Sequence, residues 1–157
     1  MSRGGPCARW LGGLVVVGLL LSCAGRRPED LGITEGRLRP CPGSPNCVSS
    51  DAPRDDPHYV APLELVVPAE RAWPAVREAA AALDGARVVA EEPRYLHLEC
   101  ESRLLGFVDD LELHLRPEQA RVAVRSASRL GYSDLGANRR RVEALRRRLL
   151  EQGVVRE

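Results

Sequence analysis

Apolar and polar residues alternate along the second half of the chain, which is the pattern of strands with one buried face. The connections between these segments are short, and each contains proline or glycine, so we expect hairpins in an antiparallel sheet. A weaker β-rich segment precedes them. The predicted strands are residues 62–67, 87–91, 94–102, 107–115 and 121–130.

Two further segments have the spacing of amphipathic helices. The first, residues 69–83, is rich in alanine and contains Pro74, so the helix either begins near this proline or kinks there. The second, residues 135–152, places leucine and valine side chains on one face. The order β-α-β-β-β-β-α therefore predicts an α+β fold, with a curved antiparallel sheet of about five strands and two helices packed on one face.

The beginning of the chain has the pattern of an export signal. Arg3 and Arg9 form a positively charged region before an apolar run, Leu11–Leu21, whose 11 residues are too few for a membrane span. The run ends in Leu20-Leu21-Ser22-Cys23, which resembles the lipobox of bacterial lipoproteins. This resemblance implies cleavage before Cys23 and lipidation of that cysteine. The alternatives are an uncleaved anchor and an ordinary signal peptide.

The same signal predicts where the protein is found. Ala24 follows Cys23 in place of an aspartate retention signal, which implies the outer membrane, facing the periplasm, in a bacterium with two membranes. Three acyl chains exceed the two signals that stable anchoring needs. We expect a signal peptide over residues 1–22, the lipidated cysteine and a flexible tether over 23–40, and a single α+β domain over 41–157. A tether of this length reaches at most roughly 55–60 Å.

Charge and composition exclude one class of function. Without residues 1–22 the chain carries 21 basic and 22 acidic residues, and such a nearly neutral envelope protein is not expected to bind nucleic acid. The charges are unevenly placed. Residues 87–115 contain seven acidic residues and three arginines, whereas residues 116–157 contain five and 11. This complementarity favours ion pairs inside the domain over an external anion.

Two cysteines enclose a turn-rich segment, Cys41-Pro42-Gly43-Ser44-Pro45-Asn46-Cys47. In an exported protein such a pair most simply forms a disulfide. The alternative is a metal site with His58 as a third ligand, but zinc needs four ligands, or three and a water, and no second Cys/His pair is nearby. We therefore predict a disulfide, and neither a metal nor another cofactor.

Strand alternation also predicts which polar residues share a face, provided that the hairpins keep the simplest register. Two rows should face the helices and one should face the opposite side, where Arg125 would bridge two carboxylates. The rows are Cys100–Asp109–Ser126, then Ser102–Phe107–Ser128 beside Tyr132, and on the opposite face Glu99–Asp110–Arg125.

An inward carboxylate at Asp109 must be hydrogen-bonded or neutralised. It either bonds Ser126, Ser128 or the Gly131 turn as a structural link, or acts with a hydroxyl as a functional group. Cys100 should simply fill space. A thiol nucleophile needs a nearby base, and strand parity places His97 and His114 on the opposite face, which leaves only His58 to approach.

The stretch Gly131-Tyr132-Ser133-Asp134 should lead into the last helix, with Ser133 or Asp134 capping its first amides. Asn138 and Arg139–Arg141 fall in the first two turns. Free amides and arginines at that position are able to bind an anion. The alternative is that these arginines pair with the acidic residues of the sheet.

Three motifs, in order, resemble the domain of unknown function 1499 (DUF1499) family. They are Pro40-Cys41-Pro42 with Ser44 to Ser50, Gly106 to Asp110, and Val124 to Glu143. The resemblance covers residues 38–152 and implies a small α+β domain, often on envelope or membrane-associated proteins, with no assigned activity. The motif positions are Cys41, Asn46, Cys47, Asp109, Asp110, Arg125, Ser126, Ser128, Arg129, Tyr132, Ser133, Asp134, Asn138 and Arg139.

These features favour a non-catalytic, lipid-anchored envelope domain that binds a small molecule or a protein partner. Its site would be the concavity between sheet and helices, with the row from Cys100 to Ser126. The first alternative is a hydrolase or transferase using Asp109 with Ser126, Ser128 or Tyr132. The second is an envelope assembly or scaffolding module, whose sign would be an exposed apolar patch.

Overall fold

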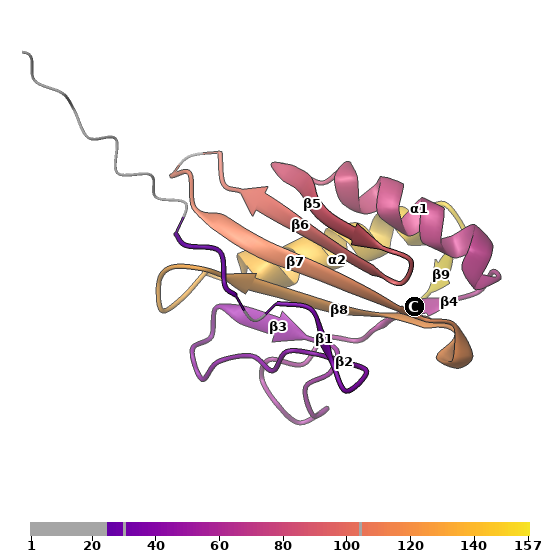
Figure 1. The fold of residues 1–157 in the computed structure, drawn as a ribbon, viewed down its shortest axis with the longest axis horizontal. Helices are drawn as coiled ribbons and strands as arrows, with labels where there is room; N and C mark the ends of the chain where they lie inside the picture. The colour runs from indigo at the N-terminus through magenta and orange to yellow at the C-terminus, as the bar shows by residue number, and fades with distance from the viewer. Residues whose placement is uncertain (1–24, 30, 104) are drawn as a thin grey trace, which may run out of the picture.

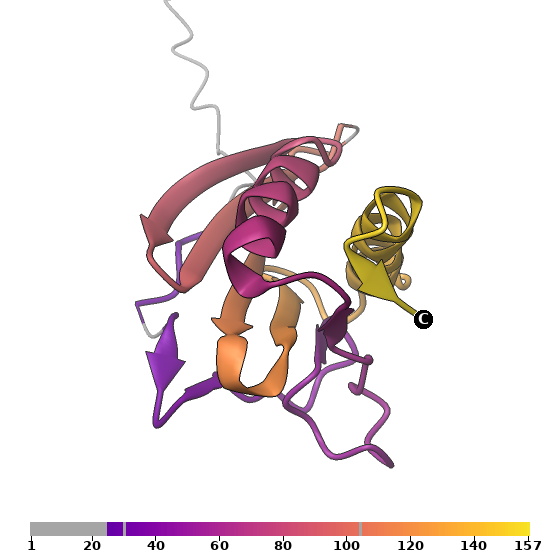
Figure 2. The same ribbon diagram turned by 90° about the vertical axis from the view of Figure 1, so that its right-hand side faces the viewer.

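The structure is a computed structural model and describes residues 25–29, 31–103 and 105–157. Helices α1 (Ala69–Ala81) and α2 (Ala137–Glu151) lie on one face of the larger of two antiparallel sheets, and Figures 1 and 2 show the two helices beside each other. The α+β class is therefore confirmed. The predicted signal peptide and Cys23 lie outside the described residues.

The sheet has seven strands, where the sequence predicted about five. Their order is β5-β6-β7-β8-β4-β9, and β3 also pairs with β8. The five expected strands are present as β4 to β8, and the two that were missed are too short for an alternating pattern. The strands are β3 (Cys47–Ser49), β4 (Leu63–Leu65), β5 (Ala86–Glu92), β6 (Tyr95–Glu101), β7 (Val108–Arg116), β8 (Arg121–Ser128) and β9 (Val155–Arg156).

The core fills the space between the sheet and the two helices, as the apolar patterns predicted. Val76 of α1 and Leu145 of α2 are fully buried against the leucine and valine side chains of β6, β7 and β8. Helix α1 begins at Ala69 and contains Pro74 in its interior, so it does not begin at the proline. The core strand residues are Leu96, Leu98, Leu111, Leu113, Val122 and Val124.

The segment for which we predicted a flexible tether makes contacts across the other face of the sheet. The short hairpin of β1 (Ile33–Thr34) and β2 (Arg37–Leu38) is drawn below β8 and beside β3 in Figure 1. Leu38 is buried with Tyr95 and Ala123, and the backbone N–H of Gly32 donates to Glu112. Much of the segment that we expected to link the anchor to the domain is therefore folded against the domain.

Strand register decides which polar residues meet. Between β6 and β7 the register is the predicted one, with Cys100 opposite Asp109. Between β7 and β8 the pairing differs by two residues, because the connection holds the 3-10 turn η1 (Pro117–Gln119) and Ala120 in a left-handed conformation. A shift by two leaves each side chain on its predicted face but changes its neighbours.

The shift corrects all three predicted rows, since Ser128, which we predicted to stand beside Phe107, pairs with Asp109. Asp109 lies opposite Ser128, while Ser126 lies opposite Leu111. On the other face Arg125 lies opposite Glu112, and so it does not stand beside Asp110.

Candidate functional site

The inward carboxylate of Asp109 is neutralised by an arginine from α2. Arg141 Nη2 donates to Asp109 Oδ2 at 2.6 Å, and both side chains are largely buried. The other terminal nitrogen of Arg141 donates to Ser126 Oγ at 2.9 Å and to Asn138 Oδ1 at 2.6 Å. The sequence left open that the arginines at the start of this helix pair with acidic residues of the sheet, but it did not give the partner, which is 32 residues away in a different element. Asp109 is therefore engaged in a link between sheet and helix.

Asn138 connects three segments of the chain at the start of α2. Its Oδ1 accepts from Ser126 Oγ at 2.6 Å, and its Nδ2 donates to Ser128 Oγ at 2.9 Å and to the carbonyl oxygen of Asn46 at 3.0 Å. The side chain is fully buried. Strand β8, helix α2 and the cysteine loop (residues 41–47) are thus held together by one amide group.

The entry to α2 is occupied by the protein's own carboxylate. Asp134 accepts hydrogen bonds from the backbone N–H groups of Gly136 at 2.9 Å and Asn138 at 2.7 Å. Burial raises the pKa of Asp134, but these backbone bonds outweigh it and hold the pKa below its ordinary value. The neighbouring Arg139 donates to the carbonyl oxygens of Pro57 and Tyr59. This arrangement does not favour the anion site that the sequence left open.

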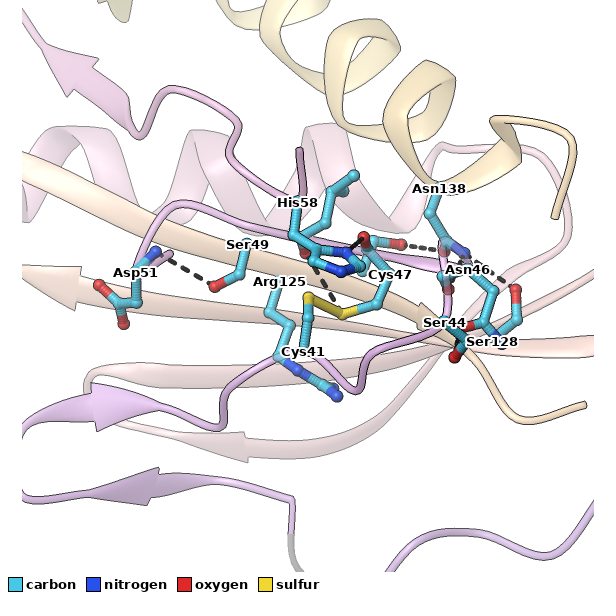
Figure 3. Close-up of a disulfide and its surroundings, with 12 residues drawn as sticks. Cys41, Ser44, Asn46, Cys47, Ser49, Asp51, His58, Arg125, Ser128 and Asn138 are labelled. Carbon is cyan, nitrogen blue, oxygen red and sulfur yellow. Dashed lines mark hydrogen bonds between the residues drawn. A yellow bond between two sulfur atoms is a disulfide. The ribbon is translucent and has the colours of Figure 1, made fainter. Parts of the chain in front are cut away.

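The cysteine loop is closed by the predicted disulfide, Cys41–Cys47, whose Cα atoms are 5.6 Å apart (Figure 3). His58 lies beside it, with Nδ1 2.8 Å from the carbonyl oxygen of Cys47. Both thiols are consumed by the bond, which removes the alternative of a metal site with His58. Asn46 Nδ2 donates to the carbonyl oxygen of Gly131 at 2.6 Å, so the loop is attached to the connection between β8 and α2.

Replacing Cys41 and Cys47 together with serine is expected to lower the free energy of unfolding by about 2–3 kcal/mol, because the bond restricts the unfolded chain. Urea denaturation followed by circular dichroism measures this loss. Wild-type protein treated with a reducing agent should lose the same amount, while the double variant should not respond to the reducing agent. An unchanged wild-type midpoint after reduction would contradict the stabilising role.

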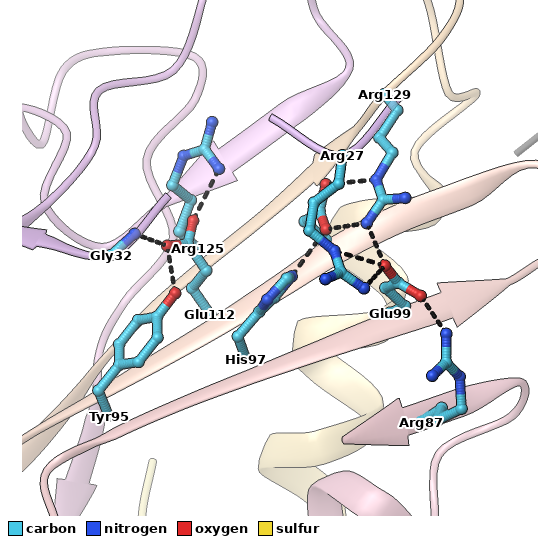
Figure 4. A network of polar contacts seen from close by, with 10 residues as sticks. Arg27, Gly32, Arg87, Tyr95, His97, Glu99, Glu112, Arg125 and Arg129 are labelled. Atoms are coloured by element: carbon cyan, nitrogen blue, oxygen red, sulfur yellow. Dashed lines mark hydrogen bonds and ion pairs between the residues drawn. The ribbon is translucent and has the colours of Figure 1, made fainter. Parts of the chain in front are cut away.

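The face of the sheet opposite the helices carries a buried ionic network (Figure 4). Arg129 donates from Nε to Asp110 Oδ2 at 2.9 Å and from Nη2 to both Asp110 Oδ1 and Glu99 Oε1 at 2.7 Å. Arg129, and not Arg125, therefore bridges the two carboxylates. His97 Nε2 lies 2.7 Å from Asp110 Oδ1, and Glu99 also pairs with Arg27 and Arg87.

These contacts explain why the carboxylates of the network are deprotonated and its arginine is protonated. Burial raises the pKa of Asp110, but the hydrogen bonds from Arg129 and His97 outweigh it and hold the pKa below its ordinary value. Burial likewise raises the pKa of Glu99, but the hydrogen bonds from Arg129 and Arg27 outweigh it and the pKa is lowered. The hydrogen bond to Asp110 in turn raises the pKa of Arg129. All three groups are charged at neutral pH.

Arg125 belongs to a second buried group on the same face. Its Nη1 donates to Glu112 Oε2 at 2.9 Å, while Tyr95 Oη and the N–H of Gly32 each donate to Glu112 Oε1 at 2.8 Å. Burial and the adjacent Glu112 carboxylate raise the pKa of Tyr95. The acidic strands β6 and β7 thus meet arginines from the later part of the chain, in agreement with the charge distribution along the sequence.

Cys100 is a buried free thiol in the core. Burial raises its pKa to about 11, so it is a neutral thiol at physiological pH. His97 and His114 lie on the opposite face, where His97 contacts Asp110 and His114 accepts a hydrogen bond from Arg116. The side chains around Cys100 therefore do not form the thiol–base pair that nucleophilic catalysis requires.

One end of the sheet carries an apolar cleft of about 280 Å³, beside Asp109 and Ser128. Its volume is several times the share of one water molecule in liquid. Phe107, which we predicted to face the helices, lies just before β7 and is 42% exposed at this cleft. The other residues of the wall are Ser102, Leu105, Leu130, Gly131, Ser133, Asp134, Leu135 and Ala137.

These observations define a class of protein: an α+β domain with a disulfide-closed loop, two buried ionic networks and an apolar cleft at one end of its sheet. Residues 37–149 match the family described as Protein of unknown function (DUF1499), and the chain belongs to this family. Comparisons with curated proteins and with solved structures gave no match. Within the described residues, no helix is long and apolar enough to cross a membrane.

Proposed function

We propose that this protein is a lipid-anchored, non-catalytic binding domain of the bacterial cell envelope, and that the apolar cleft is its binding site. The observation that carries the choice of binding over catalysis is the engagement of the polar side chains beside the cleft. Asp109 is paired with Arg141, and Ser126 and Ser128 are both hydrogen-bonded to Asn138. In a hydrolase or transferase that used Asp109, this carboxylate would have to lie within hydrogen-bond reach of the hydroxyl that it activates, and its side-chain partner here is Arg141.

The lining of the cleft indicates the chemistry of its ligand. Leu105, Phe107, Leu130 and Leu135 supply apolar surface, and a few hydroxyl and carboxylate groups lie among them. Ligand sites are mostly apolar with a small number of polar groups that fix orientation. The cleft therefore suits a molecule with a hydrocarbon portion and one hydrogen-bonding group.

The membrane anchor is proposed from the Leu20-Leu21-Ser22-Cys23 motif, which resembles a lipobox.

Native mass spectrometry of the full chain, produced in a bacterium and purified from its membranes, tests both parts of this proposal. We expect a mass that begins at Cys23 and carries acyl groups, whereas a Cys23→Ser variant should lack them. We also expect a bound molecule whose occupancy falls at least about tenfold in a Phe107→Ala variant, the ratio that about 1.4 kcal/mol of lost binding energy gives.

The matched control is Ile33→Ala, since Ile33 is an exposed apolar residue outside the cleft. This variant should keep the wild-type occupancy. A bound molecule that Phe107→Ala retains in full would remove the cleft as its site. An unacylated mature chain would remove the anchor.

A further inference from the structure

Exposed apolar side chains are concentrated at one end of the sheet. Among the described residues, seven large apolar side chains are exposed, and five of them belong to the connections that follow β6 and β8. Ile33 and Val66 are the two others. Contiguous apolar surface of this kind marks a contact with a protein or a membrane. The five residues, here named the apolar end, are Leu105, Phe107, Leu130, Tyr132 and Leu135.

The backbone at Leu135 indicates that this exposure is not incidental. Leu135 has a φ of 51°, in the left-handed region that bulky side chains rarely adopt. Its side chain is nevertheless 85% exposed, so no packing against the core compensates for the strain. Residues held in such conformations cluster at functional contacts. Tyr132, in the same connection, is 75% exposed.

The chain enters the domain at this same end. Gly25 lies against the connection after β8, where a Cβ added to it would be 3.0 Å from both Leu130 Cγ and Arg129 Cβ. Arg27 then holds the chain down through Glu99, with Nε at 2.8 Å. Figure 1 shows the start of the described chain, the connection between β6 and β7 and the connection after β8 at one end of the molecule.

This position limits how far a lipid anchor can stand from the domain. Cys23 precedes Gly25 by two residues, and two residues of extended chain span at most roughly 7 Å. Acyl groups on Cys23 would therefore enter the membrane within a short distance of Leu130. A domain on so short a connection has to present the apolar end, or its immediate surroundings, to the membrane surface.

We propose that the apolar end rests on the surface of the anchoring membrane. Its leucine and phenylalanine side chains lie in the membrane–water interface, and the long axis of the sheet points away from the membrane. This inference rests on the proposed lipid anchor, and it makes membrane lipid the molecule that the apolar cleft faces. Apolar side chains leave water when they enter the headgroup and acyl boundary, and tyrosine is enriched at that depth. They add a further contact with the membrane to that of the acyl chains, which hold the protein there.

Lipid-dependent quenching of a fluorescent label tests the orientation. The full chain, carrying Leu135→Cys or Leu105→Cys, is labelled with a fluorophore and reconstituted into phosphatidylcholine vesicles that contain nitroxide-labelled lipid. Cys100 is buried and Cys41 is bonded to Cys47. In the acylated protein Cys7 has been removed with the signal peptide and the thiol of Cys23 carries lipid, so labelling is directed to the introduced thiol. The matched control is Gln119→Cys, an exposed position in the connection between β7 and β8 at the other end of the sheet.

We expect the nitroxide lipid to quench labels at positions 135 and 105 at least threefold more than the label at 119. Equal quenching at all three positions in an acylated protein would overturn the orientation and leave the anchor intact. Protection of positions 135 and 105 from both the lipid quencher and a water-soluble quencher would also overturn it, because protein would then cover the apolar end. A mass without acyl groups identifies failure of the anchor itself.

Discussion

An Arg129→Ala variant is expected to lose about 3–5 kcal/mol of the free energy of unfolding, the cost of removing one partner from a buried ion pair. The side chain of Arg129 is 5% exposed and that of its main partner, Asp110, is 2% exposed. Without the guanidinium, Asp110 and Glu99 would remain beside each other with only His97, Arg27 and Arg87 to compensate. Urea denaturation followed by circular dichroism measures the loss.

The matched control for Arg129→Ala is Arg103→Ala. Arg103 pairs with Asp84 at 3.0 Å, but both side chains are more than four-fifths exposed, so water screens the pair. This substitution should leave the denaturation midpoint unchanged within error. If the two variants behaved alike, the network on the sheet would not be a source of stability.

Acidification provides a second readout of the Arg129 substitution. Because the pKa values of Asp110 and Glu99 are lowered in the folded protein, their contribution is present above the ordinary carboxyl pKa of about 4 and is lost as the pH falls through the folded values. The variant lacks most of this contribution. The difference in stability between wild type and variant should therefore shrink on acidification, whereas a pure packing defect would leave it constant.

An Asn138→Ala variant is expected to lose about 2–4 kcal/mol, because each buried polar group left without a partner costs about 1–3 kcal/mol. The substitution removes an acceptor for Ser126 and donors to Ser128 and to the carbonyl oxygen of Asn46. It also removes one of the acceptors of Arg141. Thermal unfolding followed by circular dichroism measures the effect.

Gln152→Ala is the control for Asn138→Ala, since Gln152 is an exposed amide residue at the other end of α2. It should change the stability little. An Asn138→Ala variant as stable as this control would mean that the hydrogen bonds between cysteine loop, β8 and α2 do not hold these segments together.

The local features of the fold could be predicted from the sequence. Alternation fixed β5 to β8 to within two residues, and helical spacing located α1 and α2, because these patterns depend only on which face of an element is buried. The bond between Cys41 and Cys47 could be predicted from their short spacing together with the export signal, since a disulfide is the simplest state of such a pair in an oxidising compartment.

The polar partners could not be predicted in the same way. The connection after β7 adopts a 3-10 turn that ends in the left-handed Ala120, and this turn moves Arg125 from Asp110 to Glu112. It also brings Asp109 opposite Ser128 in place of Ser126. Alternation gives the face of a side chain, but the conformation of one turn gives its neighbour.

Long-range contacts also decided what the N-terminal segment does and where the apolar end lies. The sequence of residues 25–40 shows no periodic pattern of apolar residues, because this segment is attached to the domain by single contacts. Examples are the contacts of Arg27 with Glu99 and of Leu38 with Tyr95. The sequence by itself determined both helices, five of the seven strands of the main sheet, the disulfide, the family resemblance and the expectation of an anchor. Only the tertiary structure decided that the N-terminal segment meets the domain beside Leu130, because positions distant in sequence become neighbours only when the strands have paired in their final register.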